Sequence, residues 1–216
     1  MPSAISSSIL EDFSWRLGFS LTPDAVGRID RFLDALELWN RRLRLTGRQT
    51  REQLIRHHVA DALACVPLLP QAGEVLDLGT GAGFPGVVLS CVRPDLTVIL
   101  LDSRQRPVSF LNEVVRVADL AGTRPVLLRA EDAAGDERLA RRQALVTSRA
   151  IRPDTFFRLA KPLLASGGLA VSMQTPAVSP ETIRAMVSPV GLQPVELRDY
   201  RLPDGDPRRL VICRVP

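Results

Sequence analysis

Lysine, cysteine and aromatic residues are scarce in this sequence. Lys161 is the single lysine among 28 lysine and arginine residues, aromatic residues make up 5%, and there are three cysteines. The cysteines, Cys65, Cys91 and Cys213, lie far apart without a C-x-x-C pair. This spacing indicates neither a disulfide framework nor a cysteine zinc site. We therefore expect buried free thiols and no metal.

Long apolar runs are also absent. The first residues, MPSAISSSIL, lack the basic start and apolar core of a secretory signal, and no stretch approaches the ~20 apolar residues of a membrane span. With 216 residues and 45% hydrophobic content, the chain is long enough for one good core and a small appended lobe. We expect a soluble, cytoplasmic protein that acts as a monomer and has no membrane partner.

Arginine supplies nearly all of the positive charge. The net charge is +4 and the isoelectric point is about 9.6. Because the guanidinium fork pairs with phosphate through two hydrogen bonds, this excess favours an anionic partner such as nucleic acid. A genome poor in lysine produces the same bias, so composition alone leaves both explanations open.

Two amphipathic helices are predicted near the start of the chain. Thr22 can cap a helix with Pro23 in its first turn, and apolar residues spaced three and four apart continue to Arg42. Thr50 begins a capping-box pattern for a second helix, which ends at Pro67. We therefore predict a helical lobe over residues 1–70.

After residue 73, short apolar runs alternate with amphipathic helices. The strand-like runs are 75–78, 97–101, 126–128, 145–147 and 169–173. Such alternation is typical of a parallel sheet with helices on both faces. A last helix, 180–187, precedes two runs, 194–198 and 209–214, that can complete the sheet as an antiparallel pair. We predict an α/β domain over residues 71–216.

A glycine-rich turn follows the first predicted strand, in the segment VLDLGTGAGFPG from Val75 to Gly86. Its glycines let the backbone turn sharply and let a ligand lie against the main chain. The segment fits G-x-G-x-x-G, and Asp102 lies about 20 residues further on, where dinucleotide-binding domains place a ribose-binding acid. It also fits D-x-G-x-G-x-G, with Asp77 as the acid. Two ligands, a dinucleotide and S-adenosylmethionine, therefore fit the turn.

Three features favour S-adenosylmethionine. Asp77 would repel a pyrophosphate but can hold a cationic amino-acid group, directly or through water. Pro85 lacks the N–H that a helix starting there would offer to a phosphate. The loop also follows a helical lobe, and residues 129–132 end the third strand where an adenine edge would lie. We therefore expect S-adenosylmethionine as the cofactor, with a dinucleotide oxidoreductase as the alternative.

Several residues are candidates for holding this methyl donor: Asp77, Gly79, Gly81, Phe84, Asp102, Ala130, Glu131 and Arg149. Asp102, expected to be an exposed acid at its strand end, can bind both ribose hydroxyls or only cap the next helix. Ala130 and Glu131 can meet the adenine or form an exposed strand end. Phe84 can pack on the donor or fill the core.

The reaction-centre motifs of two methyltransferase classes are missing. Exocyclic amines are commonly methylated with an Asn/Asp-Pro-Pro-aromatic run, and pyrimidine carbons with a cysteine, often as Pro-Cys; neither motif occurs. The corresponding segment, LVTSRAIRPD, places Arg149 and Arg152 there, and arginine cannot act as a base. A nucleophile that needs no deprotonation, such as N7 of guanine, fits, with catalysis by positioning. Arg149 can orient the donor carboxylate, hold guanine O6 or a phosphate, or form a surface ion pair.

An arginine-rich segment joins the two predicted helices. Its arginines are Arg41, Arg42, Arg44, Arg48, Arg51 and Arg56. We select the first four as candidate RNA contacts, because arginine contacts to phosphate are independent of base sequence and sensitive to salt. A solvated face is the alternative. His58 and Asp61 follow at a spacing of one turn, and we expect a structural pair there.

Seven segments together point to a known family: LELWNRRLRLTG, HHVADAL, VLDLGTGAGFPG, VILLDSRQRPVSFL, LLRAED, VTSRA and AKPLLASGGLAV. In order and spacing they resemble the bacterial small-subunit ribosomal RNA guanine-N7 methyltransferases, also called glucose-inhibited division protein B, from about Phe32 to Val215. The most specific parts are the F-P-G end of the loop, W-N-x-x-x-x-L-T and S-R-A.

This resemblance implies a Rossmann-like, seven-stranded class I methyltransferase sheet with an N-terminal helical extension. It also implies methyl transfer from S-adenosylmethionine to N7 of a guanine in small-subunit ribosomal RNA, free or in an assembling subunit. By position, the family's donor-binding residues fall on Gly79, Phe84, Ala130, Glu131 and Arg149. A methyltransferase of this fold acting on a small molecule or protein, and a non-enzymatic RNA-binding factor, stay open as alternatives.

The sequence departs from that family at two places. Arg44 stands where the family has Asn before Leu-Thr, and Ser172-Met173-Gln174 stand where it usually has Leu-Lys-Gly. A lysine that would be a candidate contact to RNA or to the target base is therefore absent. Either arginines replace it or the substrate differs.

Overall fold

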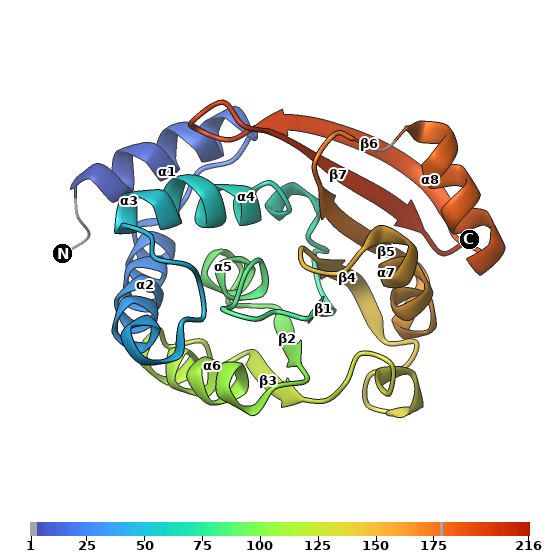
Figure 1. Ribbon diagram of the computed structural model, residues 1–216, viewed down its shortest axis with the longest axis horizontal. Coiled ribbons are helices and arrows are strands. Elements are labelled where there is room, and N and C mark those ends of the chain that lie inside the picture. Colours follow the sequence, from blue (N-terminus) through green and yellow to red (C-terminus); the bar gives the residue numbers. More distant parts are fainter. Residues whose placement is uncertain (1–3, 178) are drawn as a thin grey trace.

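A seven-stranded sheet forms the centre of the molecule in the computed structural model, which describes residues 4–177 and 179–216 (Figure 1). The strands are β1 (Glu74–Leu78), β2 (Thr97–Asp102), β3 (Thr123–Leu127), β4 (Gln143–Ser148), β5 (Leu164–Gln174), β6 (Gln193–Arg201) and β7 (Pro207–Arg214). Their order is β3-β2-β1-β4-β5-β7-β6. β1 to β5 are parallel, and β7 pairs antiparallel with both β5 and β6. The predicted α/β fold and the antiparallel end of the sheet are confirmed.

Helices cover both faces of this sheet (Figure 1). They are α1 (Ala4–Arg16), α2 (Pro23–Leu43), α3 (Arg51–Leu54), α4 (Ala60–Leu63), α5 (Gly86–Val92), α6 (Gln105–Val117), α7 (Pro153–Ala160) and α8 (Pro180–Val187). In Figure 1, α1 to α6 lie on one side of the sheet, and α7 and α8 lie on the other. None of the helices in the described ranges is long and apolar enough to cross a membrane.

The caps predicted for the N-terminal helices are present. The Thr22 hydroxyl accepts a hydrogen bond from the Ala25 amide at 3.1 Å, and Thr50 and Gln53 bond reciprocally. The second helix is not one regular α-helix, however. A π-helical turn, Ile55–Val59, joins α3 to α4, and α4 ends at Leu63. Such turns often occur at functional sites, and this one contributes to a pocket described below.

The N-terminal helices and one face of the sheet share a single hydrophobic core. Phe32 and Leu63 from the helices are fully buried in the same cluster as Val75 of β1 and Phe110 of α6. The three cysteines are free and buried, as predicted. The division of the chain at residue 70 into two domains stays a prediction.

Two strands begin three or more residues before their predicted starts. β5 begins at Leu164 instead of 169, and β3 begins at Thr123 instead of 126. The added residues include the exposed Ser166 and Gly167, which carry no apolar side chain and so give no hydrophobic pattern.

The strand order reverses between β1 and β4, which are adjacent although two strands lie between them in the sequence. In open α/β sheets, ligands bind at the carboxyl ends of the strands beside such a reversal. A ligand site is therefore expected at the loops after β1, β2, β3 and β4.

Candidate donor and substrate site

The glycine loop connects β1 to α5 and has a backbone that other residues rarely adopt. Gly79 and Gly81 have φ angles of +71° and +56°, in the left-handed region where glycine has no steric penalty. A Cβ atom on Gly86 would collide with Leu100 and Asp77. The sequence therefore needs glycine here both for the path of the loop and for its close packing on the sheet.

Asp77 of β1 holds the end of this loop through a hydrogen bond. Its carboxylate is fully buried, and Oδ2 accepts a hydrogen bond from the Gly86 amide at 2.8 Å. Burial raises the pKa of Asp77 to about 6, although the Thr80 hydroxyl, the Gly86 amide and the charge of Arg149 offset part of this increase. The side chain thus joins the strand to the start of α5, and a ligand cation nearby would favour its charged form.

Asp102 is buried, so the expectation of an exposed strand-end acid was wrong. The residue is 3% exposed because both of its carboxylate oxygens are covered. Oδ2 accepts from the Gly81 amide at 3.0 Å, and Oδ1 accepts from the Arg104 amide at 2.9 Å. The Arg104 side chain adds bonds at 3.1 and 3.3 Å. Asp102 therefore connects the end of β2 to the glycine loop.

Ala130 and Glu131 follow β3 on the same edge of the sheet. The Leu128 amide donates to the Asp102 carbonyl at 3.1 Å, which brings the segment after β3 beside the end of β2. Ala130 is half-buried. The Glu131 side chain is 63% exposed and lies 3.7 Å from Arg129. Both residues follow Leu128 within three positions on this edge of the sheet, and their contact with adenine stays a prediction.

Phe84 brings Arg149 to the glycine loop. The Phe84 ring is 4% exposed, and its centroid lies 5.1 Å from the ring centroids of both Phe32 and His58. The guanidinium carbon of Arg149, just after β4, lies 5.3 Å from the same ring centroid, in a cation–π contact. Phe84 therefore fills the core, one of its two predicted roles, and at the same time supports Arg149.

Arg149 also contacts a buried acid from the N-terminal helices. Asp61 of α4 is 4% exposed and accepts a hydrogen bond from the Tyr200 hydroxyl at 2.6 Å. Arg149 lies 3.6 Å and Arg208 lies 3.9 Å from its carboxylate oxygens. Burial raises the pKa of Asp61, while Tyr200 and the two arginines oppose this rise. One carboxylate thus joins α4, the end of β4, and the β6–β7 hairpin.

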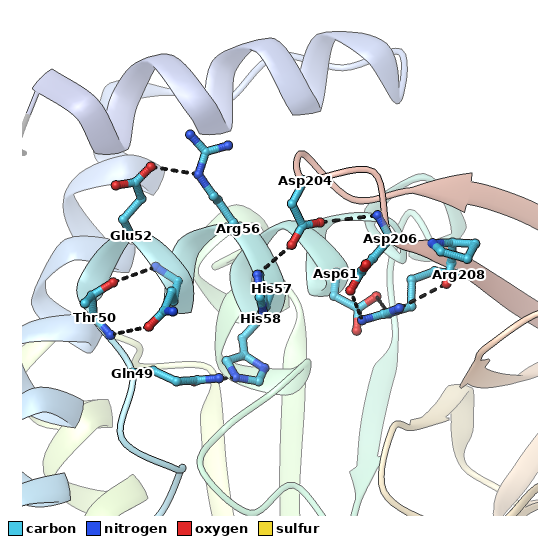
Figure 2. Close-up of polar contacts among 12 residues, drawn as sticks. Gln49, Thr50, Glu52, Arg56, His57, His58, Asp61, Asp204, Asp206 and Arg208 are labelled. Carbon is cyan, nitrogen blue, oxygen red and sulfur yellow. Dashed lines mark hydrogen bonds and ion pairs between the residues drawn. The ribbon is translucent and has the colours of Figure 1, made fainter.

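The predicted pair of His58 and Asp61 was wrong. His58 Nε2 instead lies 2.8 Å from Oε1 of Gln49 (Figure 2). The π-helical turn explains the difference, because it holds more residues than an α-helical turn and so residues three apart no longer share a face. Burial lowers the pKa of His58 to about 3, with smaller contributions from neighbouring positive charges. His58 is therefore neutral at physiological pH.

A pocket of about 430 Å³ opens beside this network. It is lined by His57, His58, Asp61, Arg149, Met173, Gln174, Thr175 and Arg208. His57 Nε2 lies 2.6 Å from the Asp204 carboxylate, which ties the π-helical turn to the tip of the β6–β7 hairpin (Figure 2). Gln174, at the position where the family usually has glycine, donates to the Ser172 hydroxyl at 2.9 Å.

Sequence reasoning missed Tyr200 and Arg208 in this pocket region. Both come from the last two strands, far from the glycine loop in the sequence. Arg208 is followed by another arginine, a pattern that does not distinguish a pocket residue from a solvated one. Only the antiparallel pairing of β7 with β5 brings Arg208 near the end of β4.

The arginine-rich segment divides into two parts. The four predicted RNA contacts are exposed, and none makes an ion pair with another described residue: Arg41, Arg42, Arg44 and Arg48. Arg51, by contrast, bonds to Asp30 at 2.9 Å and Asp34 at 2.7 Å. Arg56 bonds to Glu52 at 2.8 Å (Figure 2). Only the first part therefore has positive charge free for a partner.

The sequence matches a family model over most of its length. Residues 26–186 match GidB, described as rRNA small subunit methyltransferase G. A protein named Ribosomal RNA small subunit methyltransferase G from Anaeromyxobacter sp. (strain Fw109-5) is 34% identical over 87% of this chain and 86% of the relative. A protein of the same name from Symbiobacterium thermophilum is 34% identical over 99% of this chain and 92% of the relative.

Solved structures with a similar fold include proteins of low sequence identity to this chain. TrmN from Thermus thermophilus has a TM-score of 0.57 and 18% identity over 73% of this chain and 49% of its own. A variant of the 16S rRNA (adenine(1408)-N(1))-methyltransferase from Catenulisporales acidiphilia, solved with cosubstrate SAM, has a TM-score of 0.56 and 12% identity over 70% of this chain and 88% of its own. These similarities support the fold. On the match of the family model and on its close relatives, the chain belongs to the rRNA small subunit methyltransferase G family, GidB.

Proposed function

We propose that this protein transfers a methyl group from S-adenosylmethionine to N7 of a guanine in small-subunit ribosomal RNA. Family membership supports the reaction and the substrate class. We also propose that the enzyme is cytoplasmic and acts as a monomer, on free RNA or on an assembling small subunit. We call Asp77, Gly79, Gly81, Phe84, Asp102, Ala130 and Glu131 the donor half of the site, and the pocket beside Asp61 the acceptor half. Arg149 contacts both halves.

The residues of the donor half fit S-adenosylmethionine. Gly79 and Gly81 adopt the left-handed backbone that glycine tolerates, and because they have no side chain, the donor can lie against the main chain. Asp102 ends β2 at this edge of the sheet, where its carboxylate can accept from the ribose hydroxyls, and Ala130 and Glu131 follow β3 at the same edge, where they can meet the adenine. Asp77, with a pKa raised to about 6 by burial, favours a positively charged ligand group nearby. When bound, the donor supplies an electrophilic methyl group on a sulfonium, and S-adenosylhomocysteine leaves.

The observation that carries the proposal is the position of Arg149. Its guanidinium lies over Phe84 of the glycine loop and 3.6 Å from Asp61 in the acceptor half. The same side chain can therefore hold the donor carboxylate and form the wall of a pocket of about 430 Å³, which is large enough for a base. A donor and a nucleotide held on the two sides of Arg149 would be close to each other, and positioning of this kind is a major part of catalysis.

The end of β4 favours a nucleophile that needs no base. Ser148 is buried, and its hydroxyl accepts from the Ile151 amide at 3.4 Å. The next residue, Arg149, is permanently charged and cannot accept a proton. His58, in the same pocket, has a pKa lowered to about 3 and is a poor base. Guanine N7 carries a free lone pair, so the C–N bond can form as the C–S bond breaks without prior deprotonation.

The experiment that tests the proposal is transfer of labelled methyl groups to small-subunit particles and to naked RNA, both from cells that lack this gene. The product is digested to nucleosides. Label in 7-methylguanosine is the expected result and fixes the donor, the substrate class and the atom together. Label absent from RNA, with S-adenosylhomocysteine binding measured in the same preparation, would contradict the RNA substrate and favour a small molecule or a protein as the acceptor.

The exposed arginines of residues 41–48 are our proposed RNA contacts. Changing Arg41, Arg42 and Arg44 together to Glu should raise the KM for RNA by about tenfold or more and reduce its salt dependence, because phosphate contacts are lost. Affinity for S-adenosylhomocysteine should stay unchanged. Arg138→Glu is a matched control, since Arg138 is also exposed but pairs with Asp136 at 2.6 Å. Equal RNA kinetics for the triple variant and the wild type across a salt series would exclude this surface.

A further inference from the structure

A second pocket lies next to the donor half, and its charge is strongly positive. It has a volume of about 400 Å³ and is lined by Leu43, Arg44, Leu45, Gly81, Arg104, Gln105, Arg106 and Pro107. We call it the arginine pocket. Three of these residues are arginines and none is acidic. Gly81 belongs both to its wall and to the glycine loop, so this pocket and the donor half share a residue.

Two of the three arginines have free charge. Arg44 and Arg106 are exposed and make no ion pair with any residue in the described ranges. Many other arginines, such as Arg116 with Glu113 at 2.7 Å, are paired with an acid from a neighbouring turn. Because guanidinium groups bind phosphate with matched geometry, a phosphate group is the ligand that suits this pocket. Arg44 also belongs to the proposed RNA-contacting segment, so an RNA phosphate can reach it.

The third arginine, Arg104, bonds to Asp102, so its charge is not free to bind a phosphate. Its Nε lies 3.1 Å and its Nη2 lies 3.3 Å from the two carboxylate oxygens. The other two bonds to Asp102 come from the backbone amides of Gly81 and Arg104 and are fixed by the fold. The Arg104 side chain is 69% exposed, and a long exposed side chain can change its rotamer within nanoseconds. Of the four bonds, only those from the guanidinium can therefore be exchanged.

The ribose hydroxyls of the donor need the same acceptors. In the proposed function, Asp102 accepts from both hydroxyls, and each carboxylate oxygen has a limited number of lone pairs. Two hydroxyl bonds added to the two amide bonds and the two guanidinium bonds would exceed the roughly four acceptor sites of a carboxylate. The guanidinium of Arg104 and the ribose therefore compete for Asp102.

We propose that Arg104 alternates between two anions and so couples donor binding to RNA binding, an inference that rests on the proposed function. Without the donor, Arg104 bonds to Asp102. When the ribose hydroxyls take Asp102, the guanidinium of Arg104 turns into the arginine pocket. There it joins Arg44 and Arg106 in binding a backbone phosphate of the RNA. Each ligand then increases the affinity for the other, as thermodynamic linkage requires.

Calorimetric titration of S-adenosylhomocysteine, with and without a transcript of the small-subunit RNA, tests this coupling. For the wild type, the RNA should strengthen binding of S-adenosylhomocysteine by about fivefold or more. Arg104→Gln should bind S-adenosylhomocysteine alone at least as tightly as the wild type, because the competitor for Asp102 is gone. In this variant the effect of RNA should fall below about twofold.

Arg116→Gln is the matched control, because Arg116 is also exposed and lies on α6, the helix that follows Arg104, but pairs with Glu113. It should keep the wild-type coupling. If Arg104→Gln weakens binding of S-adenosylhomocysteine alone and keeps the effect of RNA, Arg104 only supports the carboxylate and the inference is overturned. No effect of RNA in the wild type also overturns it. Failure of the proposed function would appear differently, as no binding of S-adenosylhomocysteine or no 7-methylguanosine made by the wild-type enzyme.

Discussion

The donor half and the acceptor half of the site lie side by side but are assembled in different ways. The donor half comes from the carboxyl ends of β1 and β2 and the segments that follow β1 and β3, all on one side of the strand reversal. The acceptor half combines the π-helical turn, α4, the ends of β4 and β5, and the β6–β7 hairpin. Its parts are separated by more than half of the chain and meet at one buried carboxylate, Asp61.

This difference has a functional consequence. The donor half uses backbone geometry, which suits a cofactor that many enzymes share. The acceptor half uses side chains from loops and helix ends that can vary without changing the sheet. A substrate can therefore be specified by the helical extension and the hairpin, while the donor half stays the same. The following predictions separate the two halves, beginning with the residue that they share.

Arg149→Ala should have the largest effect, because it removes a charged side chain that contacts both halves. Loss of charge-assisted bonds to the donor should weaken binding of S-adenosylhomocysteine by roughly a hundredfold. The KM for RNA should rise as well, because a wall of the acceptor pocket is lost. Arg158→Ala, an exposed change on α7, is the control for removing an arginine. If only one of the two ligands is affected, Arg149 does not join the halves.

Asp102→Ala should disable the donor half alone. Affinity for S-adenosylhomocysteine should fall by about thirtyfold through loss of the ribose contacts, while RNA binding without donor should not weaken, because Arg104 is then free for the arginine pocket. Since Asp102 is buried and accepts from the Gly81 amide, the free energy of unfolding should also fall by about 1–2 kcal/mol, measured with urea. Asp102→Asn keeps the shape and should lose less stability. Unchanged donor affinity in a folded Asp102→Ala protein would remove Asp102 from the site.

The two halves also differ in how far the sequence predicts them. The donor half could be predicted because local rules apply: D-x-G-x-G-x-G requires a sharp turn after a strand, and Asp102 ends the next strand. The burial of Asp102 could not be predicted, because it depends on hydrogen bonds from Gly81 and Arg104 that no sequence pattern indicates. In the acceptor half, the π-helical turn moved His58 away from Asp61, and no periodicity in the sequence indicates that extra residue. Tyr200 and Arg208 reach Asp61 only through the pairing of β5 with β7, which no local pattern contains.

Asp61→Asn should affect the acceptor half alone. The amide oxygen still accepts from the Tyr200 hydroxyl, but the charge that holds Arg149 and Arg208 is lost. We expect a rise of about fivefold in the KM for RNA, with donor affinity within about twofold because Phe84 still supports Arg149. Steady-state kinetics with each substrate varied in turn measures this split. Asp199→Asn, which removes an exposed partner of Arg209, should change neither constant; a matching change in both variants would indicate a general effect of charge.

The smallest net effect should be the pH dependence of stability in the wild type, because each half contains a buried titratable group and the two act in opposite directions. Burial raises the pKa of Asp77 from 3.8 to about 6. Between these values the folded protein binds more protons than the unfolded one, so the free energy of unfolding falls as pH rises, by about 3 kcal/mol at most. Burial lowers the pKa of His58 from 6.5 to about 3. Between these two pKa values the unfolded protein binds more protons than the folded one, so the free energy of unfolding rises with pH.

In the wild type these two contributions should partly cancel between pH 4 and 6, and single substitutions should reveal them. Asp77→Asn keeps an acceptor for the Gly86 amide but removes the titration, so the free energy of unfolding should rise more steeply with pH than in the wild type. His58→Gln should give the opposite change, a shallower rise or a fall. Urea unfolding at several pH values from 4 to 6.5 measures the slopes. Identical slopes in all three proteins would mean that neither group is buried as described, and the electrostatic contrast between the two halves would be lost.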